Sequence, residues 1–167
     1  VQDYHVPKEG IIKKQMKFSS STPEELEHIK NLLKQEKIID EHIITQIINP
    51  NGRIKYKDIR KVSIGLSKKD IVSVRSKKKS AFYNCFVVIL RILHNEKFKE
   101  IHVKVFNTGK MEIPGIQDDA VLYKTLDALT KIINNISVCD VSYIKTNIQT
   151  VLINSNFNCG FYIDRDK

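Results

Sequence analysis

The clearest pattern in the chain lies between residues 81 and 115, where apolar and polar positions predict two strands joined by a turn. The run "FVVILRI" is almost continuously apolar and β-branched over the length of one strand, which indicates a strand inside a sheet. The stretch "EIHVKVFNTGKMEIPG" alternates instead, and Ile101, Val103 and Val105 fall on the face opposite to His102, Lys104 and Phe106. Gly109 supplies the positive φ that a tight turn requires.

A helix is predicted from "STPEELEHIKNLLKQEKII". Thr22 is placed to cap the helix, Pro23 suits the first helical position, and Glu25 follows the cap by three residues, as in a capping box. Apolar side chains then recur along one stripe, at Leu26, Ile29 and Leu33. The preceding segment, residues 10–20, reads as a basic strand with imperfect alternation.

A second helix is predicted from "QDDAVLYKTLDALTKIINNI". Asp118 or Asp119 serves as its cap. Its apolar stripe comprises Leu122, Leu126, Leu129 and Ile133. We expect this helix to cover the Ile/Val face of the sheet.

The segment "EHIITQIINPNGRIKYKDIRKVSIG" predicts a β-hairpin over about residues 42–60, because two β-branched runs flank the turn sequence "NPNG". In the second arm Ile54 and Tyr56 alternate with basic residues, at Arg53, Lys55 and Lys57. This positive edge either faces phosphates or is a hydrated edge that discourages aggregation, and for an isolated hairpin we favour the second interpretation.

Composition limits the class of protein. A chain of 167 residues with 41% apolar content buries one ordinary core, in one domain or two small ones. No apolar run approaches the roughly 18 to 20 residues that span a bilayer, and the first ten residues do not resemble a signal peptide, so we expect an intracellular protein without a membrane partner. The cysteines, Cys85, Cys139 and Cys159, are too far apart to indicate a disulfide framework or a zinc site.

Positive charge points to a polyanionic partner. The net charge is +9, and residues 60–80 carry eight Lys or Arg against one acid, Asp70. The densest part is a basic patch formed by Arg75, Lys77, Lys78 and Lys79. A solvated loop is the alternative interpretation of this patch.

The predicted sheet has one face without an obvious covering helix. That face carries cations and one aromatic, namely Arg91, His102, Lys104, Lys110 and Phe106. The combination suits DNA, because cations at the rim contact phosphates while a phenylalanine wedges between bases. The alternative for Phe106 is an aromatic that ends its strand and packs within its own turn.

The sequence contains no recognisable active site, and we expect neither enzymatic activity nor a cofactor. A phosphate-binding Walker A loop needs a glycine five residues before Gly109, and Lys104 occupies that position instead. The Gly-Lys turn is therefore not a nucleotide-binding loop. Asp118 and Asp119 suit helix capping better than acid–base chemistry or metal binding. The five histidines have no metal-ligand spacing, and no nucleophile–base grouping is present.

The order strand, helix, strands, "FNTGKMEIPG", helix resembles one repeat of the TATA-box-binding protein family. That family forms a pseudo-symmetric saddle of two repeats, each a curved antiparallel sheet with helices on its convex face. The motif "VFNTGKMEIPG" carries the most specific likeness, which covers residues 81–136 well and extends weakly to residues 10–33. Divergent forms of this kind are most similar to the TATA-binding-protein-like proteins of large DNA viruses.

The resemblance implies an α+β fold, a TATA-binding-protein-like half saddle with an inserted β-hairpin. Residues 1–150 would form the first repeat, in which residues 38–78 are a basic insertion that carries the hairpin. Residues 151–167 would form the opening strand of a second, truncated repeat. The site of action would be the nucleus or a cytoplasmic viral transcription site.

The resemblance also implies roles for individual residues. Phe106 would be one of two intercalating phenylalanines. Ungapped alignment puts Cys85 at the second position, a one-residue bulge would offer Phe86, and a longer shift Phe82. Contacts to phosphates or bases would come from Arg91, Lys104, Lys110 and Asn154.

Two functions follow from the resemblance. The first is a general transcription initiation factor that binds and bends duplex DNA through the minor groove and recruits a transcription-factor-B-like protein and RNA polymerase. The second is an interaction module of the same fold that has lost sequence-specific DNA reading. Lys104, His102 and Glu112 depart from the mainly apolar concave face of the family, and a carboxylate there is repelled by DNA. Glu112, Lys104 and the missing second aromatic favour the second function.

Overall fold

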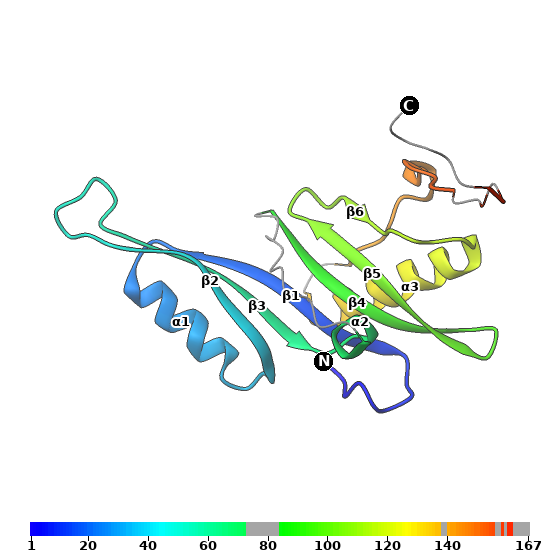
Figure 1. Cartoon of the computed structure of the whole chain (residues 1–167), viewed down its shortest axis with the longest axis horizontal. Coiled ribbons are helices and arrows are strands. Elements are labelled where there is room, and N and C mark those ends of the chain that lie inside the picture. The colour runs from blue at the N-terminus through cyan, green and yellow to red at the C-terminus, as the bar shows by residue number, and fades with distance from the viewer. Residues whose placement is uncertain (73–83, 138–139, 156–157, 159, 162–167) are drawn as a thin grey trace.

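The computed structural model describes residues 1–72, 84–137, 140–155, 158 and 160–161. The sheet strands are β1 (Gly10–Ser20), β2 (Ile38–Ile48), β3 (Tyr56–Gly65), β4 (Cys85–His94), β5 (Lys97–Phe106) and β6 (Met111–Glu112). The helices are α1 (Pro23–Leu33), α2 (Lys68–Val72) and α3 (Asp119–Ile136), followed by a short 3-10 turn, η1 (Lys145–Asn147). The predicted α+β class is confirmed: the described residues form a six-stranded antiparallel sheet with three α-helices (Figure 1).

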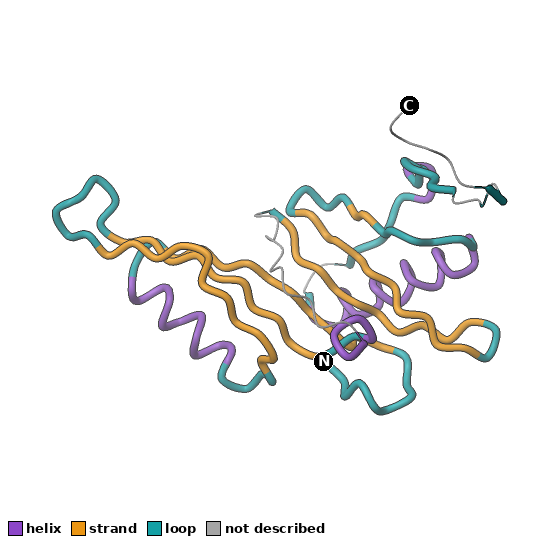
Figure 2. Tube along the Cα trace, viewed as in Figure 1, coloured by secondary structure: helices purple, strands orange, loops and turns teal. Residues whose placement is uncertain are grey.

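The strand order is β2-β3-β1-β4-β5-β6, so β1 joins the two halves of the sheet. Figure 2 shows the long β2–β3 hairpin at one end of the molecule and the β4–β6 strands at the other. The predicted hairpin therefore exists, but it is not isolated, because β3 pairs with β1 along most of its length. Arg53, Ile54 and Lys55 lie in the hairpin loop, before the second strand begins at Tyr56.

Strand β1 has the predicted bounds, and the structure explains its imperfect alternation. The register with β4 shifts between Ile11 and Lys13, which places Ile12 in a bulge where its side chain is fully buried. Gly65, at the end of β3, has a φ of +79°, and a Cβ at this position would collide with the Ile12 carbonyl oxygen. The bulge and this glycine together allow the two backbones to approach closely.

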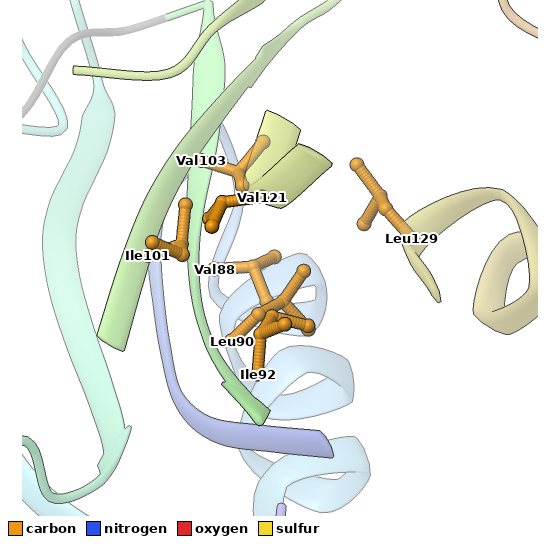
Figure 3. Close-up of a cluster of buried hydrophobic side chains, with 7 residues drawn as sticks. All are labelled: Val88, Leu90, Ile92, Ile101, Val103, Val121 and Leu129. Carbon is orange, nitrogen blue, oxygen red and sulfur yellow. The ribbon is translucent and has the colours of Figure 1, made fainter. Parts of the chain in front are cut away.

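The main core lies between α3 and one face of the sheet. Val88, Leu90 and Ile92 of β4 are buried with Ile101 and Val103 of β5. Figure 3 shows this cluster with the side chains that α3 contributes, Val121 and Leu129. The prediction that α3 covers the Ile/Val face is thus confirmed, although the buried stripe includes Val121 and Thr125 in place of Leu122. Asp118 caps α3 by accepting a hydrogen bond from the Ala120 backbone N–H at 2.8 Å.

Helix α1 begins as predicted and lies on the same face as α3. The Thr22 hydroxyl accepts a hydrogen bond from the Glu25 backbone N–H, and the Glu25 carboxylate accepts one from the Ser21 backbone N–H. The Arg60 guanidinium lowers the pKa of the Asp58 carboxyl against the opposing effect of burial, and Lys30 of α1 is close enough to lower it further. Asp58 pairs with Ser20 of β1, and Lys14 of the same strand pairs with Val88 of the α3 core. Ser20 and Lys14 are an even number of residues apart, so they lie on one face of β1, and α1 and α3 therefore cover the same face of the sheet.

The opposite face, called the open face below, is only partly uncovered. It carries Cys85, Val87, Ile89 and Arg91 of β4 and Glu100, His102, Lys104 and Phe106 of β5, which pair across the two strands. Helix α2 lies on it, because Asp70 accepts a 2.7 Å hydrogen bond from Lys13, whose neighbour in the sheet is Ile89. The N-terminal segment, residues 1–9, covers a further part of it, because Arg91 donates hydrogen bonds to the Tyr4 and Val6 carbonyls and Tyr4, His5 and Pro7 line a cavity with α2. The sequence predicted neither cover.

Candidate nucleic-acid interface

Phe106 stands at the end of β5, half-buried on the open face. Its backbone N–H donates to the Lys110 carbonyl and its own carbonyl accepts from the Gly109 N–H, each at 2.9 Å. Gly109 has a φ of +81°, and a Cβ there would meet no atom within 4 Å, so the glycine is needed for its conformation rather than for space. The turn therefore fixes Phe106 beside Lys110, whose side chain is exposed.

The β5–β6 hairpin is also held to the start of β4. The Asn107 N–H donates to the Asn84 carbonyl at 2.9 Å. Directly across the strand pair from Phe106 lies Cys85, so a small side chain is its neighbour on the open face. Phe106 thus lies at a corner of the sheet, with its backbone hydrogen-bonded within the turn and no aromatic partner opposite on β4.

Phe86 lies on the other face of the sheet. It pairs with Val105, which packs against the α3 core, and it is 41% exposed. The register between β4 and β5 is continuous, so no bulge turns Phe86 toward Phe106. Phe82 and the basic patch at Arg75, Lys77, Lys78 and Lys79 lie outside the described residues.

Lys104 and Glu112 neutralise each other on the open face. The Lys104 ammonium donates to a Glu112 carboxylate oxygen at 2.7 Å, and both residues are partly exposed. An exposed pair of this kind stabilises a fold by about 0–1 kcal/mol. Its larger effect is electrostatic, because the carboxylate that would repel a nucleic acid has a cation beside it, and that cation is no longer a dedicated phosphate ligand.

Arg91 is buried rather than exposed at a rim. It is 6% exposed, and its Nη1 donates to the backbone carbonyls of Tyr4 and Val6, each at 2.8 Å. Its Nη2 lies 3.9 Å from a Glu100 oxygen, and its Cζ is 4.6 Å from the centre of the Tyr4 ring. The Arg91 guanidinium, which was predicted to contact phosphate, thus donates its hydrogen bonds to the N-terminal segment instead.

Asn154 lies in a stretch without helix or strand, so the opening strand expected from residue 151 is not formed in the described part of that segment. The apolar residues beside it are strongly exposed, with Val151 at 91%, Leu152 at 75% and Ile153 at 79%. Nothing brings Asn154 to Phe106 in the described hydrogen bonds or strand pairs.

Two lysines that the sequence did not single out lie on the open face. Gln15 of β1 pairs with Val87 on the open face, and Lys17 lies two residues further along the same strand, so it is on the same face. Lys61 of β3 pairs with Lys17 and shares that face. Burial lowers the pKa of Lys61, and the nearby charge of Lys13 lowers it further. Two lysines are therefore adjacent on this part of the open face. The two-residue spacing of Lys13, Gln15 and Lys17 indicates that these polar side chains share one face of a strand. No local pattern indicates that β1 lies between β3 and β4.

The described residues contain no group of three or more metal-binding side chains, and none of their helices has the length and apolar composition needed to cross a membrane. Comparison of the chain with protein-family models, curated proteins and solved structures finds no significant match.

Proposed function

We propose that the chain is a DNA-binding transcription initiation factor similar to the TATA-box-binding protein family. In this proposal the open face binds the minor groove of duplex DNA, Phe106 enters a base step, and the DNA bends away from the sheet. A transcription-factor-B-like protein and RNA polymerase would be recruited by the remaining surfaces.

The observation that carries the proposal is the position of Phe106 at a hydrogen-bonded hairpin on the face opposite to α1 and α3. Burying a phenylalanine contributes about 1.5–3 kcal/mol, which is comparable with the few kcal/mol needed to unstack one base step. A single wedge therefore needs phosphate contacts in addition. Lys110, which is exposed beside the wedge, is the cation best placed to supply one.

A second candidate is a protein-interaction module of the same architecture. The burial of Arg91 and the cover provided by α2 favour it, because both reduce the area of sheet that a duplex can reach. The location of Phe86 on the α3 face also leaves Phe106 without a phenylalanine at the neighbouring position of β4, where Cys85 stands. Under this alternative the open face contacts a protein, and duplex DNA does not bind near physiological salt.

Fluorescence anisotropy with A·T-rich and G·C-rich duplexes over a range of salt concentrations tests the proposal. The wild-type protein should bind duplex, with an affinity that falls steeply as salt rises. Lys110→Ala should weaken binding to both duplexes equally and reduce the slope of log K against log salt by about one unit. Lys131→Ala, which removes an exposed lysine of α3 on the other face, is the matched control and should change neither. Absence of duplex binding by the wild-type protein near physiological salt would refute the proposal.

A further inference from the structure

A cavity of about 620 Å³ lies where the N-terminal segment, α2 and the open face meet. Its walls include Tyr4 from the N-terminal segment, Lys68 and Lys69 from α2, Arg91 from β4, and Phe98 and Glu100 from β5. The volume is in the range of small-molecule sites, roughly 300–1,000 Å³. The cavity is distinct from the corner occupied by Phe106, which does not line it.

The cavity has an excess of positive charge. Three cationic side chains, Lys68, Lys69 and Arg91, face one carboxylate, that of Glu100. The Glu100 carboxylate is already engaged, because it accepts the Lys68 backbone N–H at 2.9 Å and lies 3.9 Å from the Arg91 Nη2 atom. The Lys68 and Lys69 ammonium groups have no ion pair among the described residues, and both side chains are exposed at the cavity. An anion entering the cavity therefore meets two available donors.

The His102 imidazole also lines the cavity, close to Lys69. Burial lowers the pKa of its imidazole, and the charges of Lys69 and Lys13 lower it further against the opposing effects of Glu100 and Asp70. Burial disfavours a charge of either sign, so only the effect of Lys69 reflects the positive charge at the cavity. The N-terminal His5 imidazole lines the same cavity and offers a further donor.

Aromatic rings border these cations. The Arg91 Cζ lies 4.6 Å from the centre of the Tyr4 ring and 5.9 Å from that of Phe98. Phe98 is 41% exposed, so part of its ring remains accessible to a ligand. Aromatic faces stack on nucleobases without requiring a particular base, and lysines bind phosphate as point charges.

We propose that this cavity binds a nucleotide unit, with its phosphate at Lys68 and Lys69 and its base against Phe98. A bare anion would use only the lysines, whereas a nucleotide uses the lysines and the accessible ring together. The same chemistry is presented by a free mononucleotide and by the 5′-phosphorylated end of a single strand. The proposal does not depend on duplex binding at Phe106.

Isothermal titration with adenosine 5′-monophosphate tests the site, with adenosine and inorganic phosphate titrated separately as the two halves of the ligand. The nucleotide should bind saturably and more tightly than either half. A Lys68→Ala, Lys69→Ala double variant should weaken its binding at least about tenfold, because two charged donors are lost. Phe98→Ala should weaken binding of the nucleotide but leave the affinity for inorganic phosphate unchanged.

Lys131→Ala and Phe106→Ala are the controls and should retain nucleotide affinity, which separates this site from the proposed duplex interface. A 5′-phosphorylated hexadeoxyadenylate forms the second arm of the experiment. Binding of that strand but not of the mononucleotide, lost in the double lysine variant, would assign the site to nucleic-acid ends. Binding of neither ligand, or binding that the double variant leaves unchanged, would overturn the proposal.

Discussion

Replacing Asp70 by asparagine should release α2 from the open face. Asp70 accepts hydrogen bonds from the Lys13 ammonium at 2.7 Å, from the Ser67 N–H at 2.8 Å and from the Ser67 hydroxyl at 2.6 Å. Asparagine preserves the shape but removes the negative charge that compensates Lys13. The Lys13 side chain is only 8% exposed, so its ammonium would be left without a counter-charge in a poorly hydrated position.

The size of the effect follows from the burial of the two partners. Breaking a fully buried ion pair costs about 3–5 kcal/mol, whereas an exposed pair contributes about 0–1 kcal/mol. Asp70 is 33% exposed, so water screens part of the interaction. We expect Asp70→Asn to lower the free energy of unfolding by about 2 kcal/mol. Lys13→Met should cost less, about 1 kcal/mol, because the remaining Asp70 carboxylate keeps Ser67 and its contact with water.

Urea unfolding at neutral pH, followed by circular dichroism, measures both variants and the double variant. The double variant should be more stable than the sum of the single losses predicts, since removing both charges removes the uncompensated one. Burial raises the pKa of Asp70, but the hydrogen bonds from Lys13 and Ser67 lower it more. The contribution of Asp70 should therefore be present above pH of about 4 and lost as the pH falls further. Wild-type stability for Asp70→Asn, or a larger loss for Lys13→Met, would refute this reasoning.

Three further predictions concern stability. Leu90→Ala should lower the free energy of unfolding by about 2–5 kcal/mol, because Leu90 is fully buried. Leu93→Ala, on the same strand but partly exposed, should lower it less. Equal losses of stability for the two variants in thermal unfolding would contradict the assigned core. Thr22→Ala should cost about 1 kcal/mol by removing the cap of α1, and an unchanged unfolding midpoint would argue against the cap. The pKa of His102 is lowered by burial and by Lys69, so the unfolded chain binds more protons and stability should fall as the pH decreases through about 6.5. His102→Gln should lose this dependence, and an NMR titration that places the pKa of His102 above its ordinary value would contradict the assignment.

Local chemistry made much of the fold predictable. The hydroxyl of Thr22, the carboxylate of Asp118 and the turn at Gly109 act within a few residues, so sequence spacing alone locates them. The bounds of β1 and the two faces of β5 likewise follow from side-chain periodicity. These features required no knowledge of distant contacts.

The environment of the candidate site could not be predicted in the same way. Pairing of β1 with both β3 and β4 joins segments far apart in the chain, and no local pattern encodes that choice. The cover over Arg91 consists of backbone carbonyls of Tyr4 and Val6, which any sequence could provide. Helix α2 has five residues within a basic stretch, too few for a recognisable periodicity. Arg91 consequently looked like an exposed cation in the sequence and is buried in the structure.

The most direct test of the proposed function is the bending of an end-labelled A·T-rich duplex, measured by fluorescence resonance energy transfer. The pair Phe106→Ala and Phe86→Ala is matched, because each removes one partly exposed phenylalanine and the two residues lie on opposite faces of neighbouring strands. Circular dichroism should show that both variants remain folded. The wild-type protein and Phe86→Ala should shorten the end-to-end distance equally, whereas Phe106→Ala should leave the duplex straight. Full bending by a folded Phe106→Ala variant would contradict the proposed role of Phe106.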